Sequence, residues 1–147
     1  MQIEAKVFIK EAKQRLDKFR STLKDHRTPN RMVAAQLYSW TIRNFQQEGA
    51  LVGGWTPVTE ATRKRKEREG KEKLLVRTGA LRASFVPFAD NENAGIGSEL
   101  EYSWFHQYSS PSRNLPARPM LPTREYVDET GVRVYDFYVK QLIRDIF

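Results

Sequence analysis

Apolar residues near the start of the chain recur at steps of three and four. In residues 5–24 they are Phe8, Ala12, Leu16, Phe19 and Leu23, with Lys and Arg between them. This spacing places them on one face of an amphipathic helix. We expect the helix to end at Ser21 to Asp25 and the turn 28–30, where Pro29 forces a break.

A second helix is predicted from about Arg31 to Gln47. Its apolar stripe is Val33 or Ala34, Leu37, Tyr38, Thr41, Ile42 and Phe45. Asn30 is a plausible N-cap, and Gly49 and then Gly53 and Gly54 stop the helix. The short polar turn between the two helices indicates an antiparallel helical hairpin.

Residues 55–73 are the most polar part of the chain. Thr59 is suited to cap a short helix from Glu60 to about Lys66. Residues 63–73 read RKRKEREGKEK, a run without an apolar face to bury. We therefore expect residues 55–73 to form a flexible basic loop.

The middle of the chain predicts a small antiparallel sheet. Residues 74–76 are an apolar anchor, and residues 80–84 form about one helical turn after the turn at Thr78 and Gly79. Residues 85–89 read as a strand with Pro87 at an edge, 90–93 as a turn, and 94–98 as the hairpin partner.

The last third predicts helices around a Pro-rich segment. Residues 102–108 are an aromatic-rich short helix, and residues 109–122 are the Pro-rich segment. A helix follows from about Thr130, which caps it, with a stripe at Val132, Tyr135, Val139, Leu142 and Ile146. The whole chain, residues 1–147, is expected to be a single α+β domain whose small antiparallel sheet is flanked by N- and C-terminal helices.

The composition excludes several kinds of functional site and cellular location. The absence of cysteine excludes disulfides, thiolate zinc sites and a cysteine nucleophile. The charged N-terminus is unlike a signal peptide, and no apolar run reaches the roughly 20 residues of a membrane span, so we expect a soluble protein made and used in a cytoplasm.

The net charge of +7 is concentrated in the first half of the chain. Residues 1–50 hold ten Lys/Arg against five Asp/Glu, residues 51–75 hold seven against four, and residues 76–147 hold eight against nine. The basic half suits phosphates or an acidic protein surface. A merely solvated surface is the simpler interpretation.

No catalytic constellation emerges from the sequence. His106 stands between Phe105 and Gln107, where a histidine is most often structural, and no second ligand has metal-site spacing with it. A hydrolase using His106 with Glu99 or Glu101 is a weak hypothesis because nothing nearby promises the burial that such a pair requires. We therefore predict neither an enzyme nor a cofactor.

The large aromatic side chains divide into two expected roles. We expect Trp104 and Phe105 to pack in the core or anchor a loop. Trp55 is the candidate for an exposed interface anchor.

Several short motifs occur in a recognisable order. They are Trp55-Thr56-Pro57, Thr62 with the basic residues 63–66, Leu75 to Ser84 with Thr78-Gly79 and Leu81, Gly95 to Gly97, Tyr102 to Gln107, and Pro116-Ala117-Arg118-Pro119. In this order the chain resembles the phage virion morphogenesis family, the tail-completion and head–tail joining proteins of Mu-like and P2-like phages and prophages. The resemblance covers about residues 30–147.

The resemblance implies a structural virion protein that completes the tail and joins it to the head. It implies a hexameric ring, contacts with other tail and connector proteins, and a location in the virion after assembly in the bacterial host cytoplasm. The residues we expect at such contacts are Trp55, Arg63, Lys64, Arg65, Lys66, Arg77, Arg82, His106 and Arg118. Those we expect to be structural are Pro57, Thr78, Gly79, Leu81, Gly97, Gln107, Pro116 and Pro119.

Arg118 has two open interpretations. Held between prolines, its guanidinium is suited to a bidentate contact with a partner's carboxylate or phosphate. It is equally suited to an acidic group of its own chain. The alternative function for the whole chain is a basic module that binds the phosphates of nucleic acid. A basic ring whose lumen faces DNA would combine the two functions.

Overall fold

The computed structural model describes residues 2–76 and 78–147, and the side chains from residue 9 onward. The elements are α1 Gln2–Leu23, α2 Arg27–Gln46, η1 Ala50–Val52, α3 Glu60–Arg68, α4 Ala80–Ala83, β1 Phe85–Ala89, β2 Ala94–Ser98, α5 Tyr102–Tyr108, η2 Pro111–Arg113 and α6 Arg124–Ile146. Helices with one small antiparallel sheet confirm the predicted α+β class. No helix among these residues is sufficiently long and apolar to span a membrane.

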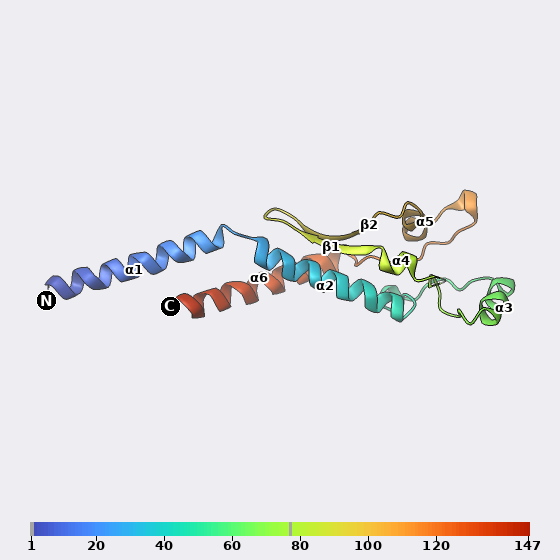
Figure 1. Cartoon of the computed structure of the whole chain (residues 1–147), viewed down its shortest axis with the longest axis horizontal. Coiled ribbons are helices and arrows are strands. Elements are labelled where there is room, and N and C mark those ends of the chain that lie inside the picture. Colours follow the sequence, from blue (N-terminus) through green and yellow to red (C-terminus); the bar gives the residue numbers. More distant parts are fainter. Residues whose placement is uncertain (1, 77) are drawn as a thin grey trace.

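The molecule is elongated, with α2 at its centre (Figure 1). The β1–β2 hairpin and α6 both pack against α2. Helix α1 extends to one end of the molecule, and α3 lies at the opposite end beyond α4 (Figure 1). Helices α1 and α3 are therefore far apart along the long axis of the molecule.

The β-hairpin forms as the sequence predicts. Its two strands are antiparallel, with Phe85 opposite Ser98 and Ala89 opposite Ala94. The turn is closed by Asp90, whose Oδ1 accepts hydrogen bonds from the amides of Glu92 and Asn93, both at 2.7 Å. An Asx side chain that binds the next amides is a common way to fix such a turn.

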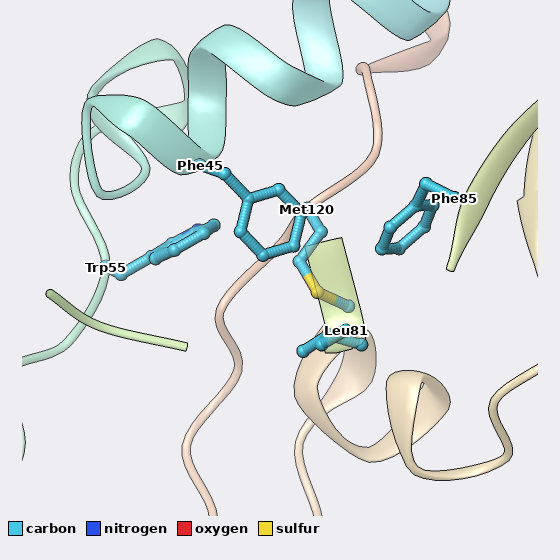
Figure 2. Packing of buried hydrophobic residues seen from close by; sticks show 5 residues of the cluster. All are labelled: Phe45, Trp55, Leu81, Phe85 and Met120. Carbon is cyan, nitrogen blue, oxygen red and sulfur yellow. The ribbon is translucent and has the colours of Figure 1, made fainter. Parts of the chain in front are cut away.

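The main hydrophobic cluster lies where α2, α4, β1 and the Pro-rich segment meet. Phe45 stands between Trp55 and Phe85, at centroid distances of 5.3 and 5.8 Å, and Leu81 and Met120 complete the cluster (Figure 2). Each such side chain stabilises the fold by roughly 1.5–3 kcal/mol when fully buried. Residues from five separate segments are thereby joined.

Gly49 permits the chain to turn back onto this cluster. Its φ is +84°, and a Cβ at this position would lie 2.2 Å from the ring of Trp55. Only glycine combines that backbone conformation with so close an approach. The predicted stop of α2 therefore also positions Trp55.

The second helix begins earlier than predicted. Helix α2 starts at Arg27, so Pro29 lies in its first turn and does not break the chain. Proline is tolerated there because the first amides of a helix have no partner within it. The sequence prediction placed the boundary four residues too late.

Asn30 is a buried polar link and not an N-cap, so that prediction was wrong. Its Nδ2 donates to the carbonyl of Asp90 at 2.9 Å, and its Oδ1 accepts the hydroxyl of Tyr135 at 2.7 Å. Asn30 thereby connects α2 to the hairpin turn and to α6. Val33, Leu37 and Val134 form a second hydrophobic cluster between the same two helices.

The predicted antiparallel pairing of the first two helices is also wrong. Helices α1 and α2 follow one another along the long axis (Figure 1). Helix α1 contacts the end of α6 instead, where the rings of Phe19 and Phe147 are 5.9 Å apart. The link between the helices is held by the amide of His26, which donates to Asn91 Oδ1 at 2.8 Å.

The last helix starts at Arg124 and not near Thr130. Thr123 is its N-cap and accepts a hydrogen bond from the amide of Tyr126 at 3.3 Å. Tyr126 and Val127 pack against the second cluster, which extends the helix toward the N-terminus. Thr130 is a fully buried position inside the helix.

The basic segment is more regular than predicted. Thr59 caps α3 as expected, but the helix continues to Arg68 and includes the first six residues of the 63–73 run. Arg63 supports it through ion pairs with Glu60 and Glu67. The mobility of residues 55–73 stays a prediction.

Replacement of Tyr135 by Phe should lower the free energy of unfolding by about 1–3 kcal/mol, because Asn30 loses a buried partner. Urea unfolding measures the change. Tyr138→Phe on the same helix is the matched control, and an equal loss in both variants would contradict the role of the Asn30 link.

Candidate docking surface

Three motifs that are distant in sequence meet at the Pro-rich segment. The carbonyl of Pro119 accepts hydrogen bonds from Trp55 Nε1 at 2.7 Å and Asn44 Nδ2 at 3.1 Å. Asn44 belongs to α2, and Trp55 follows it in the chain. We call this contact, together with the bonds of Arg118 and Gln107 described next, the clasp.

Arg118 is directed into its own chain. Only 5% of its surface is exposed. Its Nε donates to the carbonyl of Thr56 at 2.8 Å and its Nη2 to that of Pro57 at 3.4 Å. Its amide donates to the carbonyl of His106 at 2.6 Å. The interpretation that Arg118 binds an acidic group of its own chain was wrong, because its guanidinium binds main-chain carbonyls. A contact of Arg118 with a partner stays a prediction.

The charge of Arg118 is therefore balanced only by backbone dipoles. Burial lowers the pKa of its guanidinium from the ordinary value. Among the described residues, none of the ion pairs involves Arg118. An arginine tolerates this site because it keeps its proton even when buried.

Gln107 supplies the third part of the clasp. Its Oε1 accepts the amides of Met120 at 2.8 Å and Leu121 at 3.1 Å. Those bonds fix the backbone at the point where Met120 enters the core. Pro116 and Pro119 are half-buried and stiffen the same segment. The expected structural roles of Gln107, Pro116 and Pro119 agree with this geometry.

The clasp holds an open cavity at the α3 end of the molecule. Its volume is about 540 Å³, and Arg118 lies in its wall. The other lining residues come from the start of α3 and from the Pro-rich segment: Pro57, Val58, Thr59, Thr62, Pro111, Asn114, Leu115 and Pro116. The cavity combines apolar walls with one buried cation.

The four predicted contact residues of α3 differ in how many bonds their side chains already form within the chain. Arg63 is tied to Glu60 and Glu67, and Lys66 is half-buried with its Nζ on the carbonyl of Lys73. Lys64 is exposed and only 3.9 Å from Glu60 at best. Arg65 is exposed, and its side chain forms no hydrogen bond or ion pair among the described residues. Lys64 and Arg65 are therefore the available cations.

A second, smaller cavity of about 220 Å³ lies between α3, α4 and α5. Lys66, Leu81 and His106 are among its lining residues. Burial lowers the pKa of Lys66, and both burial and the nearby Arg118 lower the pKa of His106. His106 is therefore largely neutral at neutral pH.

The geometry offers no assembled reactive group in the part of the chain described. Its His and acidic residues form no cluster that could hold a metal ion. The hydroxyls of Ser84 and Ser98 are 2.6 Å apart and bond to each other. His106 Nδ1 is buried without a hydrogen-bond partner in the same residues.

The exposure of Trp55 and Trp104 differs from what the sequence predicts. Trp55, expected on the surface, is 5% exposed and belongs to the core. Trp104, expected to pack in the core or anchor a loop, is 63% exposed, and its ring contacts that of Tyr108 at a centroid distance of 4.3 Å and a tilt of 50°. Helical spacing could have paired Trp104 with Tyr108, but nothing local in sequence distinguishes an inner from an outer aromatic on a two-turn helix.

The remaining motif residues lie outside the cavity or are not described. Arg77 is outside the described residues, and Arg82 is half-buried. Gly79 has the positive φ that was expected, +78°, and precedes α4. Leu81 lies in the core, while Gly97 pairs with Val86 across the hairpin.

Arg118→Lys should lower the free energy of unfolding by about 1–3 kcal/mol, because an ammonium cannot reproduce the fork that reaches both carbonyls. Chemical denaturation of this variant against Arg124→Lys, at an exposed position, measures the effect. Equal stability of the two variants would contradict the clasp.

Acidification should destabilise the fold through His106. Its pKa is lowered in the folded chain, so the folded state binds fewer protons than the unfolded state between that pKa and about 6.5. The contribution of His106 to the free energy of unfolding is complete above about pH 6.5, and it is lost as the pH falls through that value toward the pKa of the folded state.

Thermal melts at about pH 7.5 and 5.5 test this expectation. The fall in Tm between the two should be smaller for His106→Gln than for the unchanged chain. An identical fall in both proteins would show that His106 does not titrate in this way.

Comparison with known proteins gives one family match. The family model described as the phage virion morphogenesis family matches residues 7–139. An uncharacterized protein of Methanocaldococcus jannaschii is 27% identical over 106 residues, which cover 68% of this chain and 76% of that protein. No solved structure matches the chain.

Proposed function

This chain belongs to the phage virion morphogenesis family, and we propose that its task within virion assembly is to complete the tail and join it to the head. The observation that carries the proposal is the docking surface at the α3 end, where α3 carries the exposed cations Lys64 and Arg65 and its first turn lines an open cavity. We propose a purely structural role, in which the chain binds other virion proteins and carries out no reaction.

The docking surface is suited to an acidic protein partner. Lys64 and Arg65 are exposed on α3, and Arg118 adds a buried positive charge in the cavity wall. Charges of one sign at an interface steer association and select partners of the opposite sign. The apolar walls of the cavity add area that an inserted side chain can bury.

Axial symmetry of a tail leads us to propose a ring of identical subunits, hexameric by resemblance. Each subunit would use two different surfaces toward its neighbours, because rings require heterologous interfaces. The α3 end would then face the connector or the tail. The location that follows is the virion, after assembly in the host cytoplasm.

A nucleic-acid contact is the second candidate function, favoured by the net charge of +7. Within residues 9–24 six Lys/Arg oppose two Asp/Glu. Such a module binds DNA with an affinity that falls steeply as salt rises. The basic 63–73 run has no aromatic residue for base stacking, which favours a protein partner for that end.

Deletion of the gene should leave filled heads and separate tails in electron micrographs of induced lysates. Complementation with the unchanged gene should restore infectious particles. Intact virions in the deletion lysate would exclude the proposed role and favour the DNA-binding alternative.

The docking surface is tested in the same assay with a double variant, Lys64→Glu and Arg65→Glu. We expect at least a tenfold loss of infectious particles, since two attractive contacts become repulsive. Lys71→Glu with Arg144→Glu carries the same charge change outside α3 and is the control. Full rescue by the α3 variant would show that this surface is not the contact.

A further inference from the structure

Helix α1 carries an apolar stripe that its own chain covers only in part. The stripe is Ile9, Ala12, Leu16, Phe19 and Leu23, in alternating steps of three and four. Ile9 is 65% exposed and Leu16 is 48% exposed, whereas Phe19 contacts Phe147 of α6. The N-terminal part of α1 runs past the end of α6 (Figure 1). A stripe with this period is typical of a helix that pairs with another helix.

The charges beside this stripe define the partner. The positions that flank it in a helix pair are occupied by Lys13, Arg15 and Arg20. Among the described residues, none of the charged side chains of residues 9–24 forms an ion pair. Two copies of α1 side by side would repel each other, so the complementary surface must be acidic.

Helix α6 presents such a surface on its outer face. Val132 is 73% exposed, and Asp128, Glu129 and Asp136 surround it at steps of three and four. Ile143, also exposed, continues the same face seven residues beyond Asp136. Of the buried residues of α6, Thr130 and Val134 lie on the opposite side of the helix, and Ile146 lies at its C-terminal end.

Ion pairs within the chain neutralise only part of this acidic charge. Asp128 is 3.8 Å from Arg124, and Asp136 is 2.7 Å from Lys140, both as exposed pairs that contribute little. Glu125 and Glu129 form no ion pair within the described part of the chain. The outer face of α6 therefore combines exposed apolar side chains with uncompensated negative charge.

We propose that α1 of one copy of this chain docks on the outer face of α6 of a second copy. The two helices have 22 and 23 residues, so both are about 33–35 Å long. Because the two surfaces differ, the contact can repeat from copy to copy, as the heterologous interfaces of a ring require. The inference rests on the proposed ring of identical subunits and names the surfaces that build it.

Charge reversal with complementation tests the contact. One variant carries Lys13→Glu and Arg20→Glu on α1, and the other carries Asp128→Lys and Glu129→Lys on α6. Sedimentation velocity of the purified full chain over a range of concentrations measures self-association. Each variant alone should associate at least tenfold more weakly than the unchanged chain, and an equimolar mixture should recover association.

The mixture recovers because the altered helix of each variant, and also its unaltered helix, then meets a surface of opposite charge on the other variant. Lys10→Glu with Lys18→Glu is the control, with the same charge change on α1 away from the stripe. The control should associate like the unchanged chain.

Three results would overturn the inference: an unchanged chain that stays monomeric up to about 1 mM, a control as weak as the variants, or a mixture without recovery. The deletion phenotype is independent of these results. Separate heads and tails together with a monomeric chain would reject the α1–α6 contact and leave the proposed function standing.

Discussion

The carbonyl of Pro119 is the point on which the rest of the structure depends. Trp55 and Asn44 both donate to it, so one backbone oxygen joins the end of α2, the segment after it and the Pro-rich segment. Next to it, Arg118 holds the carbonyls of Thr56 and Pro57. Buried polar groups of this kind are costly unless each has its partner, so these bonds stabilise one arrangement of the segments over others.

This constraint changes how the motif residues relate to function. Trp55, Gln107 and Arg118 act inside the chain, and what they present to the outside is the cavity and α3. Of the residues predicted at partner contacts, Lys64 and Arg65 are therefore the ones that the proposed docking surface exposes on α3. The opposite end of the molecule, with α1 and the end of α6, is where we propose contacts between copies (Figure 1).

Sequence periodicity predicted the elements that bury one continuous face. The hairpin, the short helices around residues 60 and 105, and the cap at Thr59 follow local rules that act within a few residues. The errors arose where tertiary contacts decide. Asn30 is a residue type that caps helices, yet Asp90 and Tyr135 bind the nitrogen and the oxygen of its side-chain amide. Thr123 and Thr130 are equally good caps locally, and only the packing of Tyr126 and Val127 selects the first.

The site was harder to predict for the same reason. The motifs indicated which residues matter, but not that Arg118 turns inward, because its partners are main-chain carbonyls that leave no mark in sequence. Nor could spacing tell that Trp55 is buried against Gly49 while Trp104 is exposed. Burial depends on how distant segments meet, and only the structure contains that information.

The most direct test of this account is a cryo-electron microscopy structure of the head–tail junction in the assembled virion. The account predicts a ring of this chain in which the α3 end and its cavity contact a different protein, while Arg118 stays bonded to Thr56 and Pro57 of its own chain. A junction without this chain, or a ring whose α3 end contacts no other protein, would contradict it.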